Sequence, residues 1–163
     1  MNETEFQDLL KTMPVYVTGT EYTVQDDEYK SLYPDMLTAY IYNGTEVDIR
    51  EAVVAFVAWD KNNLPVKIKG EYSFSGGEYV CEVTFDEVNL IPGGTFGENY
   101  GYGLDKSMNI AKFEAIVVSA TAFSGETWEN PYYEAWKAMY SEKKYTDSLS
   151  TEVTVVDSNF EVE

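Results

Sequence analysis

The sequence of 163 residues offers mainly carboxylates for acid–base chemistry, because it contains 29 Asp and Glu but no His. Histidine is the usual general base near neutral pH, so its absence excludes His-dependent triads. Paired carboxylates can act as acid and base in glycoside hydrolysis, but no pair stands out here. The single cysteine, Cys81, lies in the alternating stretch EYVCEV, which favours a buried thiol over a nucleophile. We expect no catalytic residues and no enzyme activity; the alternative is a small carboxylate enzyme.

Metal binding is restricted by the same residue types. With one Cys and no His, the chain cannot assemble a zinc site from these ligands. The acidic stretch QDDEYKSLYPD (25–35) could hold calcium through Asp26, Asp27 and Asp35, but it lacks the spacing of an EF-hand loop. We expect a solvated loop there, no metal site and no cofactor, with calcium as the alternative.

Aromatic side chains are the remaining candidates for binding, since Phe, Trp and Tyr make up 15% of the sequence. In the stretch GENYGYGLD, Tyr100 and Tyr102 stand among glycines, a composition that suits a recognition loop. In the stretch GETWENPYYEAW, the rings of Trp128 and Tyr132 could stack on sugars. These four residues are the predicted binding residues. The patterns favour structural roles for both stretches, as an irregular sheet edge and as part of the core.

The second aromatic stretch also predicts a helix. Asn130 precedes Pro131, which suits an N-cap followed by the first helical position. We expect the apolar stripe of this helix to pack inward against an open face or end of the sheets. The residues that form the stripe at helical spacing are Tyr132, Trp136, Met139 and Tyr140.

The elements that must position these residues are mostly strands. Asn2 and Glu5 form the capping-box pattern of a short helix, which Pro14 keeps from continuing. Beyond it, runs rich in β-branched and aromatic residues alternate with turn signals such as Asn43-Gly44. The strand of residues 51–60 is apolar on both faces and should be covered on both sides. The predicted strands are 15–25, 36–43, 51–60, 66–74, 78–86, one short strand within 91–103, and 113–123.

About seven strands at short intervals predict an all-β, immunoglobulin-like β-sandwich with a short N-terminal helix and a C-terminal amphipathic helix. We divide the chain into an N-terminal helix (1–13), the sandwich with its packed C-terminal helix (14–145), and a polar tail or extra edge strand (146–163).

The net charge of −18 bears on partners rather than on the fold. It disfavours nucleic acid and anionic membrane surfaces, which both need Lys and Arg. The longest apolar run, AVVAFVAW, is too short for a membrane span. Asn2 and Asn43 stand in Asn-x-Thr patterns, which matter only in a secreted eukaryotic protein.

Several short motifs, in this order, resemble FxLYD-type domains of bacterial cell-envelope proteins. IYNGTE (41–46) leads into VAFVAWDKNNLPV (54–66), where Phe56 and Asp60 match the Phe-x-Leu-Tyr-Asp strand. Ala58 and Trp59 replace its Leu and Tyr. LIPGGTF resembles the Pro-Gly turn before a later strand. GETWENPYYEAW is similar to the closing motif of a related uncharacterised family in Gram-positive lipoproteins and membrane-anchored zinc-ribbon proteins.

The resemblance spans roughly residues 15–140 and implies an immunoglobulin-like sandwich exposed outside the cell membrane. It carries no catalytic or ligand residues. We therefore expect a non-catalytic extracytoplasmic interaction or structural module, anchored through a segment outside this chain. Its partner would be another envelope protein or a glycan, and its oligomeric state stays open. The alternative is a carbohydrate-binding module that uses exposed Tyr and Trp.

Overall fold

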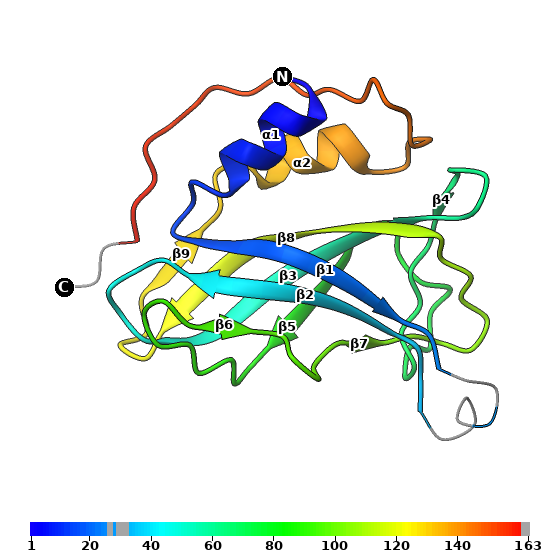
Figure 1. Cartoon of the computed structure of the whole chain (residues 1–163), viewed down its shortest axis with the longest axis horizontal. Helices are drawn as coiled ribbons and strands as arrows, with labels where there is room; N and C mark the ends of the chain where they lie inside the picture. Colours follow the sequence, from blue (N-terminus) through cyan, green and yellow to red (C-terminus); the bar gives the residue numbers. More distant parts are fainter. Residues whose placement is uncertain (26–27, 29–32, 161–163) are drawn as a thin grey trace.

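The computed structural model describes residues 1–25, 28 and 33–160, which form two antiparallel sheets and two short helices (Figure 1). The protein is mostly β, and its two sheets make an open, sandwich-like arrangement. In chain order the elements are α1 (Glu3–Leu10), β1 (Val15–Thr23), β2 (Met36–Asn43), β3 (Ile49–Trp59), β4 (Pro65–Val66), β5 (Cys81–Phe85), β6 (Thr95–Phe96), β7 (Tyr102–Gly103), β8 (Lys112–Ala122), β9 (Thr127–Glu129) and α2 (Tyr133–Tyr140).

The first sheet is organised around β2. Strand β1 pairs antiparallel along one side of β2, starting with Val15 opposite Asn43. The other side of β2 is shared by β6 and β7, which are two residues long. The register shifts between Val17 and Gly19, which marks a β-bulge. Away from the bulge, alternate residues of β1 and β2 face the second sheet and the others face outward.

The second sheet is organised around β3. Strand β8 pairs along one side of β3 and carries the short strand β9 on its own far side. The other side of β3 is divided between β5, which pairs with Ala52–Phe56, and β4, which pairs with Ala58 and Trp59.

From Val54 to Trp59 both faces of β3 are buried, so the prediction that this strand is covered on both sides is confirmed for that part, whereas Glu51 and Val53 are half-buried. On the face toward the first sheet, Phe56 stacks with Tyr102 of β7 at a ring-centroid distance of 6.4 Å. On the opposite face, Trp59 meets Tyr140 of α2 edge-on at 5.7 Å. The core therefore has three layers: the first sheet, the second sheet and the helices.

The two helices lie together over the outer face of the second sheet (Figure 1). Helix α1 has the predicted capping box, in which Asn2 and Glu5 bond each other's backbone N–H groups. Each helix is only eight residues long, so no helix in the described part of the chain could cross a bilayer. The predicted inward packing of the aromatic stripe is confirmed, since its four members are all buried: Tyr132, Trp136, Met139 and Tyr140.

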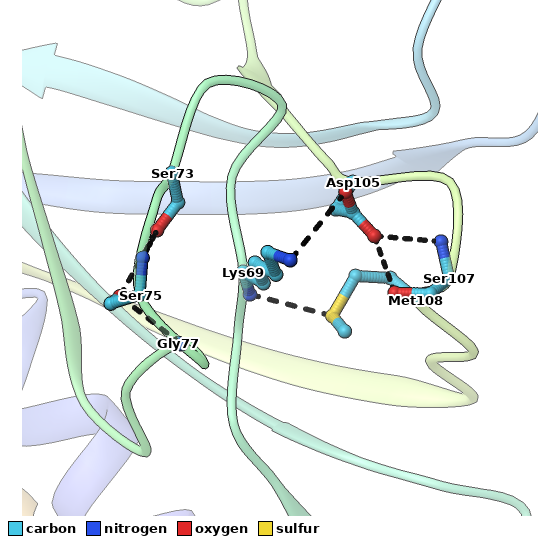
Figure 2. Close-up of polar contacts among 7 residues, drawn as sticks. All are labelled: Lys69, Ser73, Ser75, Gly77, Asp105, Ser107 and Met108. Carbon is cyan, nitrogen blue, oxygen red and sulfur yellow. Dashed lines mark hydrogen bonds and ion pairs between the residues drawn. The ribbon is translucent and has the colours of Figure 1, made fainter.

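The predicted strand over 66–74 is wrong beyond its first residue, Val66, which ends β4. Strand β5 occupies the neighbouring part of the same edge of β3, and residues 67–80 leave the sheet as a loop that keeps only isolated bridges, from Ile68 to Glu78 and from Gly70 to Leu104. Figure 2 shows how Lys69 ties this loop to a neighbouring turn: its backbone N–H donates to Met108 Sδ at 3.4 Å, and its Nζ lies 4.0 Å from Asp105 Oδ1.

Two details of the final elements also differ from the predictions. The prediction of one short strand in 91–103 is corrected to two, β6 and β7, and the unpredicted strand β9 runs through Trp128. Asn130 does not cap α2, which begins only at Tyr133. Its N–H donates to Val118 and its side-chain amide to Val117, so β8 holds this residue. Its side-chain oxygen accepts from the Tyr132 N–H at 2.9 Å, so Asn130 closes the turn that precedes the helix.

Candidate functional site

An open groove with a volume of about 660 Å³ lies where three distant segments meet. One wall comes from residues 12–16, at the link between α1 and β1. The second comes from residues 42–47, at the end of β2. The third comes from residues 158–160, near the C-terminus, whose approach to this end of the molecule is visible in Figure 1. Small ligands usually bind in concave sites that combine apolar and aromatic side chains with a few polar groups.

Two tyrosines form the aromatic side of the groove. Tyr16 of β1 and Tyr42 of β2 stand directly opposite each other, with ring centroids 5.4 Å apart and planes tilted by 53°. Their strand neighbours Val15 and Ile41 are fully buried, so the tyrosines point to the outer face of the first sheet. Both side chains are half-buried and present part of their rings to the groove.

The turn after β2 forms a rigid side of the groove. The fully buried Asn43 donates from its side-chain amide to the carbonyls of Val47, at 2.8 Å, and Leu90, at 3.1 Å. The side-chain carbonyl oxygen of Asn43 accepts hydrogen bonds from the backbone N–H and the hydroxyl of Thr45. Gly44 donates to the Pro14 carbonyl at 2.8 Å, which joins this turn to the first wall. The Asn-x-Thr pattern at Asn43 is therefore structural, because its amide is already used.

The third wall is held by two of the predicted binding residues. Trp128 Nε1 donates to the Ser158 hydroxyl at 2.8 Å. The Tyr132 hydroxyl donates to the carbonyl of Val156 and accepts from its N–H, at 3.0 and 2.8 Å. Trp128 is only 6% exposed and Tyr132 only 2% exposed, so neither presents an open ring face. Both instead fasten the tail that completes the groove.

Of the predicted residues Tyr100 and Tyr102, Tyr102 lies toward the other end of β2, and Tyr100 lies beside the middle of that strand, where its carbonyl accepts from the Thr38 hydroxyl. Tyr102 pairs with Leu37, five positions from Tyr42, which corresponds to about 17 Å along a strand. Burial, followed by the nearby Cys81 thiol, raises the pKa of Tyr102 to about 12. Tyr100 is 60% exposed and stacks on Phe96 at 5.0 Å. The structure therefore does not bring the four predicted residues into one site.

The charges of the groove suit an uncharged ligand. None of its described lining residues is Lys or Arg, and its one carboxylate, Glu46, is exposed. The side chains of Tyr16, Tyr42, Glu46 and Asn159 make no hydrogen bonds to other described residues. Their hydroxyl, carboxylate and amide groups are thus free to contact a ligand, as donors and as acceptors.

A second cluster of polar groups lies between the second sheet and the helices. Glu3 of α1 accepts hydrogen bonds from the hydroxyls of Tyr140, at 2.7 Å, and Tyr145, at 2.6 Å. The Lys112 ammonium lies 4.0 Å from the centre of the Tyr145 ring and 3.8 Å from Glu114 Oε1. Burial raises the pKa of Glu114 to about 7, against the opposing effect of Lys112.

Glu114 could act as a proton donor near neutral pH, and such shifted groups are candidates for function. However, its side chain is only 23% exposed, and both oxygens of the neighbouring Glu3 are already engaged. The contacts join α1, α2, β8 and the tail, so we assign the cluster a structural role in holding the helices on the sheet.

Metal and thiol chemistry find little support in the described residues. The calcium candidates Asp26 and Asp27 lie outside them, while Asp35 accepts from the backbone N–H of Gln25 at 2.8 Å. The described part of the chain contains no group of three or more Cys, Asp or Glu side chains arranged to hold a metal ion. Cys81 is buried, and this burial raises the pKa of its thiol, which disfavours the reactive thiolate.

The sequence reasoning missed Tyr16, Tyr42 and Phe160. Strand alternation carried a usable signal, because Tyr16 and Tyr42 each alternate with buried aliphatic residues and so had to face outward. Nothing local to Phe160 indicated that the tail returns to this end of the first sheet.

Together, the fold and the groove define a mostly β protein of two sheets with a preformed recess at one end. Residues 36–143 match the family of unknown function DUF5780, and because this is more than half of the chain, the protein belongs to that family. A hypothetical protein from Peptoclostridium difficile 630, solved by X-ray crystallography, shares 12% identity. The alignment covers 83% of this chain and 95% of that one, with a TM-score of 0.65, which supports the fold alone. The comparison with curated proteins finds no match.

Proposed function

We propose that the protein is a non-catalytic interaction module of the bacterial cell envelope, exposed outside the membrane, and that its two sheets are an immunoglobulin-like sandwich. The motifs IYNGTE, VAFVAWDKNNLPV and LIPGGTF support this proposal through their resemblance to FxLYD-type domains. The net charge of −18 argues against nucleic acid and anionic lipid as partners.

The groove is the observation that carries the proposal. Hydrogen bonds hold each of its three walls. Gly44 joins the second wall to Pro14 of the first, Asn43 braces the second wall through Val47, and Trp128 holds Ser158 of the third, so the recess exists before any ligand arrives. A preformed site avoids the entropic cost of ordering loops during binding. Such a recess suits a protein whose role is to hold another envelope component.

The available reactive groups favour binding over catalysis. The sequence has no His, the thiol of Cys81 is buried, and Glu114 lies beneath the helices. Among its described lining residues the groove has one carboxylate, Glu46, whereas glycoside hydrolysis by the usual route needs two that converge.

Retention on envelope material tests the proposal. The full chain is mixed with envelope fragments from a Gram-positive bacterium, the fragments are sedimented, and the bound fraction is measured. We expect the wild type to sediment with the fragments and Tyr42→Thr, which keeps a strand-forming residue, to be largely lost from them. Tyr72→Thr is the matched control, because Tyr72 is 84% exposed in a loop outside the groove. Equal retention of both variants, or none of the wild type, would contradict the proposal.

The cellular location needs a separate measurement. An epitope-tagged form of the complete natural protein is expressed in its host, and intact cells are treated with protease. We expect the tag to be degraded without cell lysis, whereas protection until lysis would refute an extracytoplasmic position.

A further inference from the structure

The aromatic side of the groove has the form of a shallow cradle. Tyr16 and Tyr42 lie side by side on neighbouring strands, and the 53° tilt between their rings gives two faces that meet at an angle. An aromatic face is partly negative, so it attracts the partly positive C–H groups on the face of a pyranose ring. Phe160 adds an apolar ring from the tail. The cradle therefore matches a ligand with flat C–H faces.

The polar groups of the groove match the hydroxyls of the same ligand. The hydroxyls of Tyr16 and Tyr42 and the amide of Asn159 can each donate and accept, and Glu46 can accept. Sugar hydroxyls need such mixed partners around their edges. A purely apolar ligand would leave these groups unused.

The charges around the groove restrict the class of ligand further. An anionic ligand would meet Glu46 and the field of a chain with net charge −18, without any Lys or Arg among the described lining residues. A cationic ligand would be attracted by the same field, but among the described lining residues it would meet one carboxylate, Glu46, which is exposed and so only weakly attractive in water. An uncharged ligand therefore matches the described lining of the groove best.

From these features we infer that the groove binds a neutral oligosaccharide, with Tyr16 and Tyr42 as the stacking platform and Asn159 and Glu46 as hydrogen-bonding partners. The inference rests on the proposed function and names the ligand class for its site. It moves the sugar-stacking role from Trp128 and Tyr132, which are buried, to tyrosines that are open to the groove. The walls need little reorganisation, because hydrogen bonds hold them in place.

Calorimetric titration with four trisaccharides tests the inference. Cellotriose and the N-acetylglucosamine trimer are neutral, the glucosamine trimer is cationic, and trigalacturonate is anionic. We expect at least one neutral trimer to bind and trigalacturonate not to bind. Tyr42→Thr and Tyr16→Thr should each weaken binding about tenfold, while Tyr42→Phe, which keeps the ring, should lose less. Tyr72→Thr should leave binding unchanged.

Each other outcome counts against the inference. Binding of only a charged trimer, or neutral binding that both Thr variants leave intact, would overturn it. A further outcome is that no trimer binds, that retention on envelope fragments still requires Tyr42, and that protease treatment of the fragments abolishes retention. In that case the ligand is a protein, the inference of an oligosaccharide fails, and the proposed function stands. If neither trimers nor fragments bind, both proposals fail. If Tyr42→Thr does not fold, the binding affinities of Tyr16→Thr and Tyr42→Phe test the inference in its place.

Discussion

Replacing Glu114 by Gln should stabilise the protein at neutral and alkaline pH. Glu114 stands on the face of β8 toward the helices, two residues from Lys112, which pairs with Trp59 of β3. The groups that face it are Lys112 of the same strand, Glu3 of α1, and Tyr140 and Tyr145 from α2 and the tail. Burial raises the pKa of its carboxyl group to about 7, Lys112 opposes this, and Glu3 adds to it.

The sign of the effect follows from proton binding. The ordinary pKa of this group is 4.5, so between pH 4.5 and about 7 the folded state holds a proton that the unfolded chain releases. The contribution of Glu114 to the free energy of unfolding is therefore fully present below pH 4.5 and is lost as the pH rises to about 7. A change in pKa from 4.5 to about 7 corresponds to about 3 kcal/mol, at 1.36 kcal/mol for each tenfold change in proton affinity. The 23% exposure of the side chain makes this an upper bound.

Urea unfolding of the wild type and Glu114→Gln between pH 5 and pH 8.5 measures the effect. Near pH 5 the folded state holds the protonated Glu, which is close to Gln in shape and charge, and ionisation of the unfolded wild type accounts for a difference of only about 1 kcal/mol or less. By pH 8 the variant should be more stable by up to about 3 kcal/mol. Glu126→Gln, an exposed control, should run parallel to the wild type at every pH. A constant difference between wild type and Glu114→Gln across this range would refute the reasoning.

Three further substitutions test the packing of the fold. Trp136→Ala removes a fully buried ring of α2 and should lower the free energy of unfolding in urea by about 3–5 kcal/mol. A decrease below about 1 kcal/mol would mean that the ring does not belong to the core. Asn43→Ala should lower the free energy of unfolding, measured by calorimetry, by about 3 kcal/mol, because the carbonyls of Val47 and Leu90 lose their hydrogen-bond donor. An unchanged melting temperature would contradict the structural role of this turn. Gly77→Ala should lower the melting temperature, because the φ of Gly77 is +91° and an added Cβ would lie 2.7 Å from the Ile68 carbonyl oxygen. Gly76→Ala, where an added Cβ meets open space, is the control and should leave the melting temperature unchanged. Equal effects of the two substitutions would refute this.

Elements with strong local signals were predictable from the sequence. Residues 36–43 combine β-branched and aromatic residues with the turn signal of Asn43 and Gly44, and β2 has the predicted bounds. The capping box of Asn2 and Glu5 is equally local and is present in α1. In both cases neighbouring residues determine the conformation, so no distant contact was needed to predict it.

Elements that depend on distant contacts were not predictable. Residues 66–74 alternate like a strand, but β5 pairs with Ala52–Phe56 and displaces them from most of the edge of β3. Asn130 has the sequence of a helix cap and its side-chain oxygen does accept from the Tyr132 N–H, but its bonds to Val117 and Val118 of β8 hold it one turn before α2 begins. The groove depends on where the tail runs, which is set by its contacts with Trp128. No local pattern contains that information.

The central claim is that the preformed groove is the binding surface of this protein. The most direct measurement is a backbone-amide NMR shift map of the uniformly labelled full chain during titration with soluble envelope-derived fragments. The claim predicts shifts confined mainly to residues 12–16, 42–47 and 158–160. Saturable shifts around Tyr100 and Tyr102 with an unchanged groove would contradict it.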